Sequence, residues 1–303
     1  MKLYSLDKNW VNIRIWFIIK MIWILGAIVA QVLGAEEKEM SGLDQSKNNG
    51  LDYEVDIEIF NSPADYDNEK IPYSGYENEE RLASYPSEWD WTVANAVTEV
   101  KNERGCNSSY IFAAVGAVES LLYLQGRTNG TLYEFSEQVI LDCDKSATCK
   151  GGNISEPFNF MQTQGNVIEA FYPYEGNSYR CRFNLMPPDL LFNISGYRQI
   201  QPNNYSALYE AIRENPVAVF ININSEEFFS YKSGIFNDSL CKVSPLNHAM
   251  LAVGYSENQF IRFKNSWGPD WGMDGYVLIG INNENESQGG SCGMLKYGLI
   301  PFV

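Results

Sequence analysis

The sequence has little positive charge, a single histidine and no internal repeats. Its 303 residues include 22 Lys and Arg against 38 Asp and Glu, which gives a formal net charge of −16. This balance argues against nucleic acid and anionic membrane surfaces as partners, because both bind basic proteins. The apolar content of 45%, with 14% aromatic residues, excludes a disordered chain and indicates a well-filled core.

The apolar stretch 21–32 is too short to span a bilayer alone. Basic residues precede it, and small residues near Gly34 suit a cleavage site. We interpret 1–35 as a signal peptide and expect secretion to the extracellular space, or delivery to the endo-lysosomal lumen. A signal anchor is the alternative, because Ile15–Ile19 extends the apolar run beyond Lys20. Only in that case do we expect stable membrane association.

The six cysteines are an even number, which in an exported chain predicts disulfides. Spacing alone leaves fifteen pairings open. Seven N-x-S/T sequons are present, as expected of a secreted glycoprotein. We expect Asn107 to be too enclosed for a glycan because it adjoins a half-cystine. The predicted glycosylation sites are the other six: Asn129, Asn153, Asn193, Asn204, Asn237 and Asn285.

Residues 36–83 carry fourteen acidic residues against four basic ones. Within them, 51–60 alternates apolar and acidic residues, as a strand with one acidic face would. A solvated acidic spacer is the interpretation we favour, because no hairpin partner is nearby.

From about residue 84 the chain is typical of a globular α+β protein. Apolar periodicity predicts a buried helix over 109–125, ended by Gly126, and a second helix over 135–143. Further along, turn residues separate four predicted strands: 216–223, 249–256, 259–265 and 275–280. This order predicts a domain 84–303 with a helical lobe (about 95–195), a strand-rich lobe (about 196–303) and a cleft between them.

Three separate segments form a candidate catalytic constellation. Asn107, Ser108 and Ser109 precede the helix 109–125, where a helix N-terminus stabilises a developing anion. His248 directly precedes the predicted strand 249–256, and Asn265 follows 17 residues later, near Trp267. An asparagine can orient a histidine ring, and the tryptophan can shield that bond from water. The alternatives are that the polar residues only cap the helix and that the lone histidine is structural.

These segments resemble the papain/cathepsin family of cysteine peptidases. The family signature C-G-[SA]-C-[WY] is followed by His and Asn some 130–150 residues downstream. Here Cys106–Tyr110 reads CNSSY, with His248 and Asn265 at 139 and 156 residues beyond Ser109. The resemblance runs from Tyr85 to Val303 and includes YPSEWDW, FSEQVILDC, CKGG, NHAMLAVGY and KNSWGPDWGMDGY. It implies a papain-like two-lobed fold with a helical lobe and a β-barrel-like lobe.

The resemblance also implies the disulfides and the state of the catalytic site. The pairs are Cys106 with Cys149, Cys143 with Cys181, and Cys241 with Cys292, so that no free thiol remains. The family's nucleophilic cysteine falls on Ser109, and its oxyanion-stabilising glutamine falls on Glu103. A serine cannot be stored as a thiolate, and an ionised carboxylate accepts hydrogen bonds rather than donating them. The family's long helical inhibitory propeptide has no counterpart in 36–83.

The resemblance places several residues on the walls of the substrate cleft. Gly151 and Gly152 would pair with an extended ligand, and Trp271 is retained. A glycan on Asn153 would narrow this groove. The remaining predicted subsite residues are Asn153, Ile154, Phe220, Asn247 and Ala249.

The resulting hypothesis is a secreted, monomeric and catalytically inactive peptidase homologue that binds a peptide or protein in the inter-lobe cleft, with no cofactor or metal. One alternative is a Ser-His-Asn hydrolase or a condensing enzyme similar to silicateins, which also carry Ser-Tyr at this point but keep the glutamine. Another is an active cysteine peptidase, as homology alone suggests. The sequence argues against that one, because the resemblance leaves no unpaired cysteine near His248.

Overall fold

The computed structural model describes residues 86–183, 186–237 and 241–303. The predicted signal peptide, the acidic segment 36–83 and its alternating stretch 51–60 lie outside these residues.

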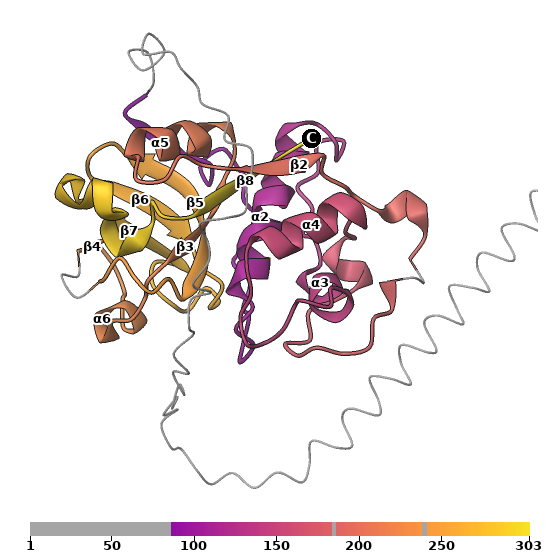
Figure 1. The fold of residues 1–303 in the computed structure, drawn as a ribbon. Helices are drawn as coiled ribbons and strands as arrows, with labels where there is room; N and C mark the ends of the chain where they lie inside the picture. The colour runs from indigo at the N-terminus through magenta and orange to yellow at the C-terminus, as the bar shows by residue number, and fades with distance from the viewer. Residues whose placement is uncertain (1–85, 184–185, 238–240) are drawn as a thin grey trace, which may run out of the picture. The chain divides into compact units, whose positions relative to one another are not determined.

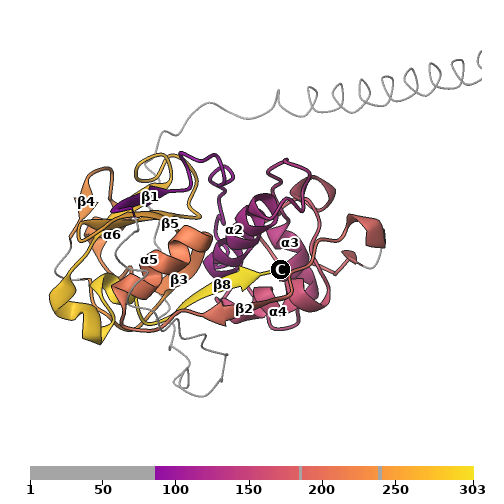
Figure 2. The same cartoon turned by 90° about the horizontal axis from the view of Figure 1, so that it is seen from above.

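The central element is helix α2 (Ser109–Leu124), which is buried over most of its length. Its sequence SYIFAAVGAVESLLYL is apolar on nearly every side, as in helices that are covered all round. It packs on strands β3 (Val217–Ile221) and β5 (His248–Ser256), and also on helices α3 (Glu137–Cys143) and α4 (Ser155–Thr163). Figures 1 and 2 both place α3 and α4 on the side of α2 away from β3 and β5.

The second half of the chain forms one mixed sheet with the order β2-β8-β3-β5-β6-β7-β4, with β1 paired to β5. Most neighbours are antiparallel, and β4 pairs with β7 in parallel. Helices α5 (Tyr205–Glu214) and α6 (Glu226–Phe229) belong to the same half. The remaining strands are β1 (Glu88–Asp90), β2 (Gly196–Gln199), β4 (Ile235–Phe236), β6 (Phe260–Lys264), β7 (Tyr276–Gly280) and β8 (Gly298–Phe302).

The helices predicted over 109–125 and 135–143 match α2 and α3, and the four predicted strands match β3, β5, β6 and β7. The prediction of a barrel-like lobe is wrong, because the sheet stays open. Its terminal strands β2 and β4 do not pair with each other, and β2 packs instead on α4.

The pairing of strand β1 with β5 requires a glycine at position 254. Asp90 faces Gly254 in the ladder, and a Cβ at Gly254 would lie 2.5 Å from the Trp89 carbonyl oxygen. Because a side chain would collide with backbone there, only glycine allows the chain entering the domain to pair with the buried strand that carries His248.

Two hydrophobic cores flank the α2–β5 contact. One is built from α2, α3 and α4, together with Phe220, Ala249 and Leu251 of the sheet. The other lies within the strand-rich half, around Phe228, Phe263 and Ile279. The start of α2 and the start of β5 are therefore held at the boundary between the two cores. Among the helices of the described residues, none has both the length and the apolarity that crossing a membrane requires.

Candidate active site

Ser109 is the first residue of α2, and its side chain contacts the start of β5. The Ala249 backbone N–H donates to Ser109 Oγ at 3.2 Å. Ser109 is 7% exposed and His248 is 5% exposed. Among the hydrogen bonds of the described residues, none joins Ser109 to His248, so the hydroxyl is fixed by the backbone of β5 rather than by the imidazole.

His248 and Asn265 are brought together by two antiparallel strands. His248 opens β5, and Asn265 directly follows β6, the neighbouring strand. His248 Nε2 lies 2.8 Å from Asn265 Oδ1, which also accepts from the Ser266 N–H at 2.9 Å. A backbone N–H can only donate, so it fixes this Asn265 atom as the oxygen. His248 Nε2 is then the donor, and Nδ1 is the free acceptor of the neutral ring.

Burial keeps this imidazole neutral. Desolvation lowers the pKa of His248 to about 4, and the bond to Asn265 only partly opposes the shift. A neutral ring can act as a base, but it does not supply the imidazolium partner that stabilises a stored thiolate.

The side chain of Glu103, which precedes α2 in the sequence, lies at the N-terminus of this helix. Its Oε2 accepts from the Ser108 N–H at 2.7 Å, and the nearby Ser109 N–H also favours the charged carboxylate. Its Oε1 accepts from Ser266 Oγ at 3.0 Å and from Trp267 Nε1 at 3.1 Å. One donor thus comes from the helical lobe and two come from the segment after β6. The carboxylate, rather than the Ser108 side chain, caps the helix.

The protonation of Glu103 changes near neutral pH. Burial raises the pKa of Glu103 to about 7, although the bonds from Ser266, Ser108, Trp267 and Ser109 favour the charged form. Because the backbone and indole N–H groups can only donate, the observed contacts fit the ionised carboxylate, which prevails above this pH.

Trp267 connects Glu103 to His248 and to an aromatic cluster. Its ring centroid lies 5.0 Å from that of His248, which fits the predicted shielding of the His–Asn bond. Phe229 stacks on Trp267 with centroids 5.5 Å apart and planes inclined by 10°, and Phe229 is 38% exposed. The indole of Trp271 packs edge-on to Trp267 and donates to the Phe229 carbonyl. An apolar, partly exposed surface therefore adjoins the site.

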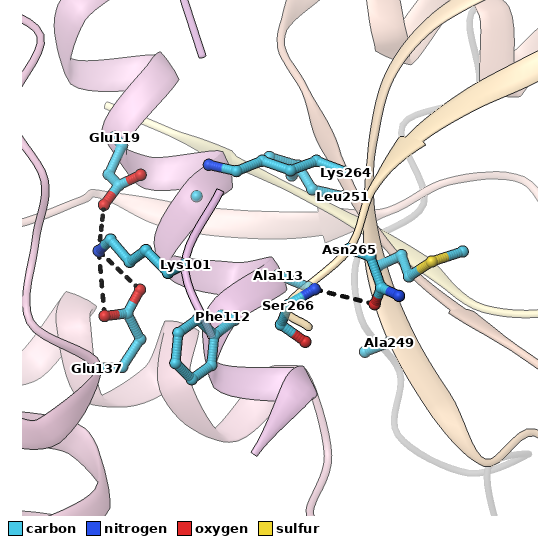
Figure 3. A pocket seen from close by; sticks show the side chains of 12 residues that line it. Lys101, Phe112, Ala113, Glu119, Glu137, Ala249, Leu251, Lys264, Asn265 and Ser266 are labelled. Carbon is cyan, nitrogen blue, oxygen red and sulfur yellow. Dashed lines mark hydrogen bonds and ion pairs between the residues drawn. The ribbon is translucent and has the colours of Figure 1, made fainter. Parts of the chain in front are cut away.

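A charged cluster lies behind the site, around a cavity of about 20 Å³, which is room for one water molecule. Lys101 Nζ lies 3.0 Å from Glu119 and 2.9 Å from Glu137 (Figure 3). Burial disfavours the Lys101 ammonium, but the two carboxylates outweigh it and raise the pKa of Lys101. Asn265 and Ser266 line the same cavity, so this buried cluster underlies the segment that orients His248.

The predicted cleft residues are distributed between surface and core. Ile154, Phe220 and Ala249 are buried. Asn247 is half-buried, and its Oδ1 accepts from the Ile223 N–H at 2.9 Å. Because Ile154, Phe220 and Ala249 are buried, little of their side-chain surface is accessible to a ligand. Their roles in a subsite stay predictions.

On the other wall, Gly152 is required by packing. A Cβ there would lie 2.5 Å from the Tyr110 ring, whose hydroxyl accepts from the Thr148 N–H at 3.0 Å. Asn153 is half-buried, and its Oδ1 accepts from the Ser155 N–H at 3.1 Å. Pairing of Gly151 and Gly152 with a ligand, and a glycan on Asn153, stay predictions.

The disulfides are the three pairs that the resemblance implies: Cys106–Cys149, Cys143–Cys181 and Cys241–Cys292, with no cysteine left free.

The expectation that Asn107 is enclosed is wrong. Cys106 is buried, but the next residue turns outward and Asn107 is exposed, with its N–H bonded to the Cys149 carbonyl at 3.2 Å. Across 86–183, 186–237 and 241–303, no group of three His, Cys, Asp or Glu side chains is placed to hold a metal ion.

Sequence reasoning missed Ser266 and Phe229. Ser266 binds both Glu103 and Asn265, and its position directly after Asn265 was the available signal. Phe229 has no comparable signal, because its exposure beside Trp267 depends on how α6 packs.

Comparison with known proteins agrees with this geometry. The family model described as papain family cysteine protease matches residues 85–302. Chymopapain of Carica papaya is 34% identical over 249 residues, covering 81% of this chain and 67% of chymopapain. Stem bromelain of Ananas comosus is 36% identical over 219 residues, covering 72% of this chain and 98% of bromelain.

A solved structure gives the same result for the fold. The crystal structure of a Carica candamarcensis cysteine protease in complex with E-64 has a TM-score of 0.66 and 34% identity to this chain. It covers 72% of this chain and 99% of that protease. The chain therefore belongs to the papain family of cysteine proteases and has the papain-like fold.

Proposed function

We propose that this protein is a catalytically inactive papain-family homologue that binds a peptide or protein between its lobes without cleaving it. The observation that carries the proposal is the position of the Glu103 carboxylate. It accepts a hydrogen bond from the Ser108 N–H at the start of α2, beside the Ser109 N–H, where the family's glutamine is expected to donate to the oxyanion.

The energetic effect on catalysis is large. Removing one oxyanion donor typically costs about 3–4 kcal/mol of transition-state stabilisation. Here the ionised carboxylate lies beside the Ser109 N–H and repels a second negative charge. Ser109 adds a further barrier, since a hydroxyl must lose its proton to a base in each turnover.

The binding half of the proposal rests on what the site retains. The partly exposed Phe229 and Trp267 give an apolar surface beside Ser109 and His248. The Carica candamarcensis relative binds E-64, and we infer that a ligand of this chain uses the same region. Pairing of every described cysteine in a disulfide supports an oxidising location, extracellular or endo-lysosomal. We infer that the protein acts as a monomer.

A Ser-His-Asn hydrolase is the second candidate. The observation in its favour is the neutral His248 with Nδ1 free to accept a proton, held by Asn265. Ser109 and His248 would then perform the base-assisted attack of serine hydrolases.

Four proteins assayed on fluorogenic peptides distinguish these functions: wild type, Ser109→Ala, Ser109→Cys, and Ser109→Cys combined with Glu103→Gln. We expect wild type to match Ser109→Ala, because neither turns over substrate. Ser109→Cys should recover little, and the double variant at least ten times more, because sulfur and the oxyanion donor act as a unit. Wild-type turnover that Ser109→Ala abolishes would establish the hydrolase instead.

Binding is tested separately by titrating extended peptides into the Ser109→Ala protein and following tryptophan fluorescence. Phe229→Ala is the informative variant, because it removes the ring stacked on Trp267. Saturable binding that weakens in this variant supports the proposal. A panel of peptides that neither binds nor perturbs Trp267 contradicts it.

A further inference from the structure

The tripeptide Asn107-Ser108-Ser109 is an N-x-S sequon whose hydroxyl residue is Ser109. The family signature has glycine and cysteine at the first and third of these positions. The two departures therefore change the catalytic segment and create a glycosylation sequon at the same time.

Asn107 is also accessible. It is exposed, while its neighbours Cys106 and Ser108 are buried. Its backbone is anchored by the bond to the Cys149 carbonyl, and its side chain makes no hydrogen bond with any described residue. An acceptor amide at this position is free to carry a large substituent without breaking a contact of the fold.

Most other sequon asparagines are engaged in the structure. Asn204 caps α5 through its Oδ1 and donates to Gln201 through its Nδ2. Asn193 donates its Nδ2 to the Met161 carbonyl at 3.4 Å.

Asn153 and Asn285 are half-buried, and the sequon of Asn237 extends beyond the described residues. Among the fully described sequons, Asn107, Asn129 and Asn193 are exposed, and of these Asn193 has its Nδ2 engaged in a hydrogen bond. Asn129 lies past the other end of α2, and 16 helical residues span about 24 Å.

We propose that Asn107 carries an N-linked oligosaccharide, and that Ser109 serves as the sequon hydroxyl for its attachment. Asn107 Nδ2 forms a bond to the anomeric carbon of N-acetylglucosamine in a lipid-pyrophosphate-linked oligosaccharide. The bond from that carbon to the pyrophosphate oxygen breaks, the lipid pyrophosphate leaves with the electron pair, and the amide loses one proton to a base.

A glycan at Asn107 changes which ligands reach the site. Its attachment point is two residues before Ser109, on the α2 side of the site, whereas Phe229 and Trp267 lie on the side of the strand-rich lobe. The sugar chain covers the approach to Ser109 from the first side and leaves the aromatic surface open. This inference uses the exported location within the proposed function and is independent of the loss of activity.

The test expresses the full chain through the secretory pathway of a eukaryotic cell and maps glycopeptides by mass spectrometry. Wild type and Ser109→Thr should carry a glycan at Asn107. Ser109→Ala and Asn107→Gln should lose it while Asn129 stays modified. Asn129→Gln is the matched control at the far end of α2 and should lose only its own glycan.

Each outcome decides the proposal. An unmodified Asn107 beside a glycosylated Asn129 overturns this inference and leaves the exported location standing. Both sites unmodified overturns it and also contradicts that location. A glycan at Asn107 that persists in Ser109→Ala refutes the role of the hydroxyl. Because transfer precedes folding, material retained in the cell gives the same answer if a variant fails to fold.

Discussion

Replacing Glu103 with glutamine keeps the shape of the side chain and removes its charge, so it isolates the cost of burying this carboxylate. The pKa of Glu103 is raised by burial from 4.5 to about 7. A raised pKa means that the folded protein binds more protons than the unfolded chain between these two values. The contribution of Glu103 to stability is therefore complete below about pH 4.5 and is lost as the pH rises through about 7.

The shift fixes the magnitude. A change of one in a pKa corresponds to 1.36 kcal/mol, so the rise in the pKa of Glu103 from 4.5 to about 7 corresponds to about 3 kcal/mol. Glutamine does not titrate, and its hydrogen bonds do not change with pH. The difference in unfolding free energy between Glu103→Gln and wild type should therefore move in favour of the variant by about 3 kcal/mol from about pH 4.5 to about pH 8.

The assay is urea unfolding of both proteins, with disulfides intact, at several pH values across this range. The comparison removes the contribution of His248. That group has the opposite sign, because its lowered pKa makes stability fall as the pH drops from 6.5 towards 4. Glu284→Gln, at an exposed glutamate, controls for losing a surface charge. A free-energy difference that stays constant with pH would refute the assignment of the buried charge to Glu103.

Two further predictions concern the framework of the site. Lys101→Met leaves Glu119 and Glu137 buried without the ammonium that contacts both. We expect the free energy of unfolding, measured by urea titration, to fall by about 3–5 kcal/mol. A decrease below about 1 kcal/mol contradicts this role. Thiol reagents should label no cysteine in the folded protein without reductant, because all six are paired, and stoichiometric labelling under those conditions would disprove the pairing.

The sequence was most informative where pattern and packing coincide. α2 is apolar on nearly every side and β5 is a continuous apolar strand, so both were predictable, as was the meeting of His248 with Asn265. The open sheet was not, because closure depends on where the short strands β2 and β4 pair, and their sequences are weakly patterned.

For the polar residues of the site, the sequence indicated which residue types are present but not which hydrogen bonds they form. The presence of Glu103 predicted a defective oxyanion site, but not that its carboxylate would accept donors from both lobes. That arrangement depends on the segment 266–267 folding back over the start of α2. The exposure of Asn107 was predicted wrongly for a related reason, since a disulfide fixes the backbone of its neighbour without burying the next side chain.

The hydrogen bonds of Glu103 also bear on the history of the protein. Since the carboxylate binds the Ser108 N–H and lies beside the Ser109 N–H, placing sulfur at position 109 leaves a charge at the expected anion site. Restoring glutamine at position 103 leaves the site without a thiol. If the proposed loss of catalysis is correct, each single reversion gains little, and a lineage with both substitutions has no one-step route back to proteolysis. On the proposed function, catalysis would no longer constrain residues such as Asn107 and Phe229, and they would be free to diverge towards another use of the same scaffold.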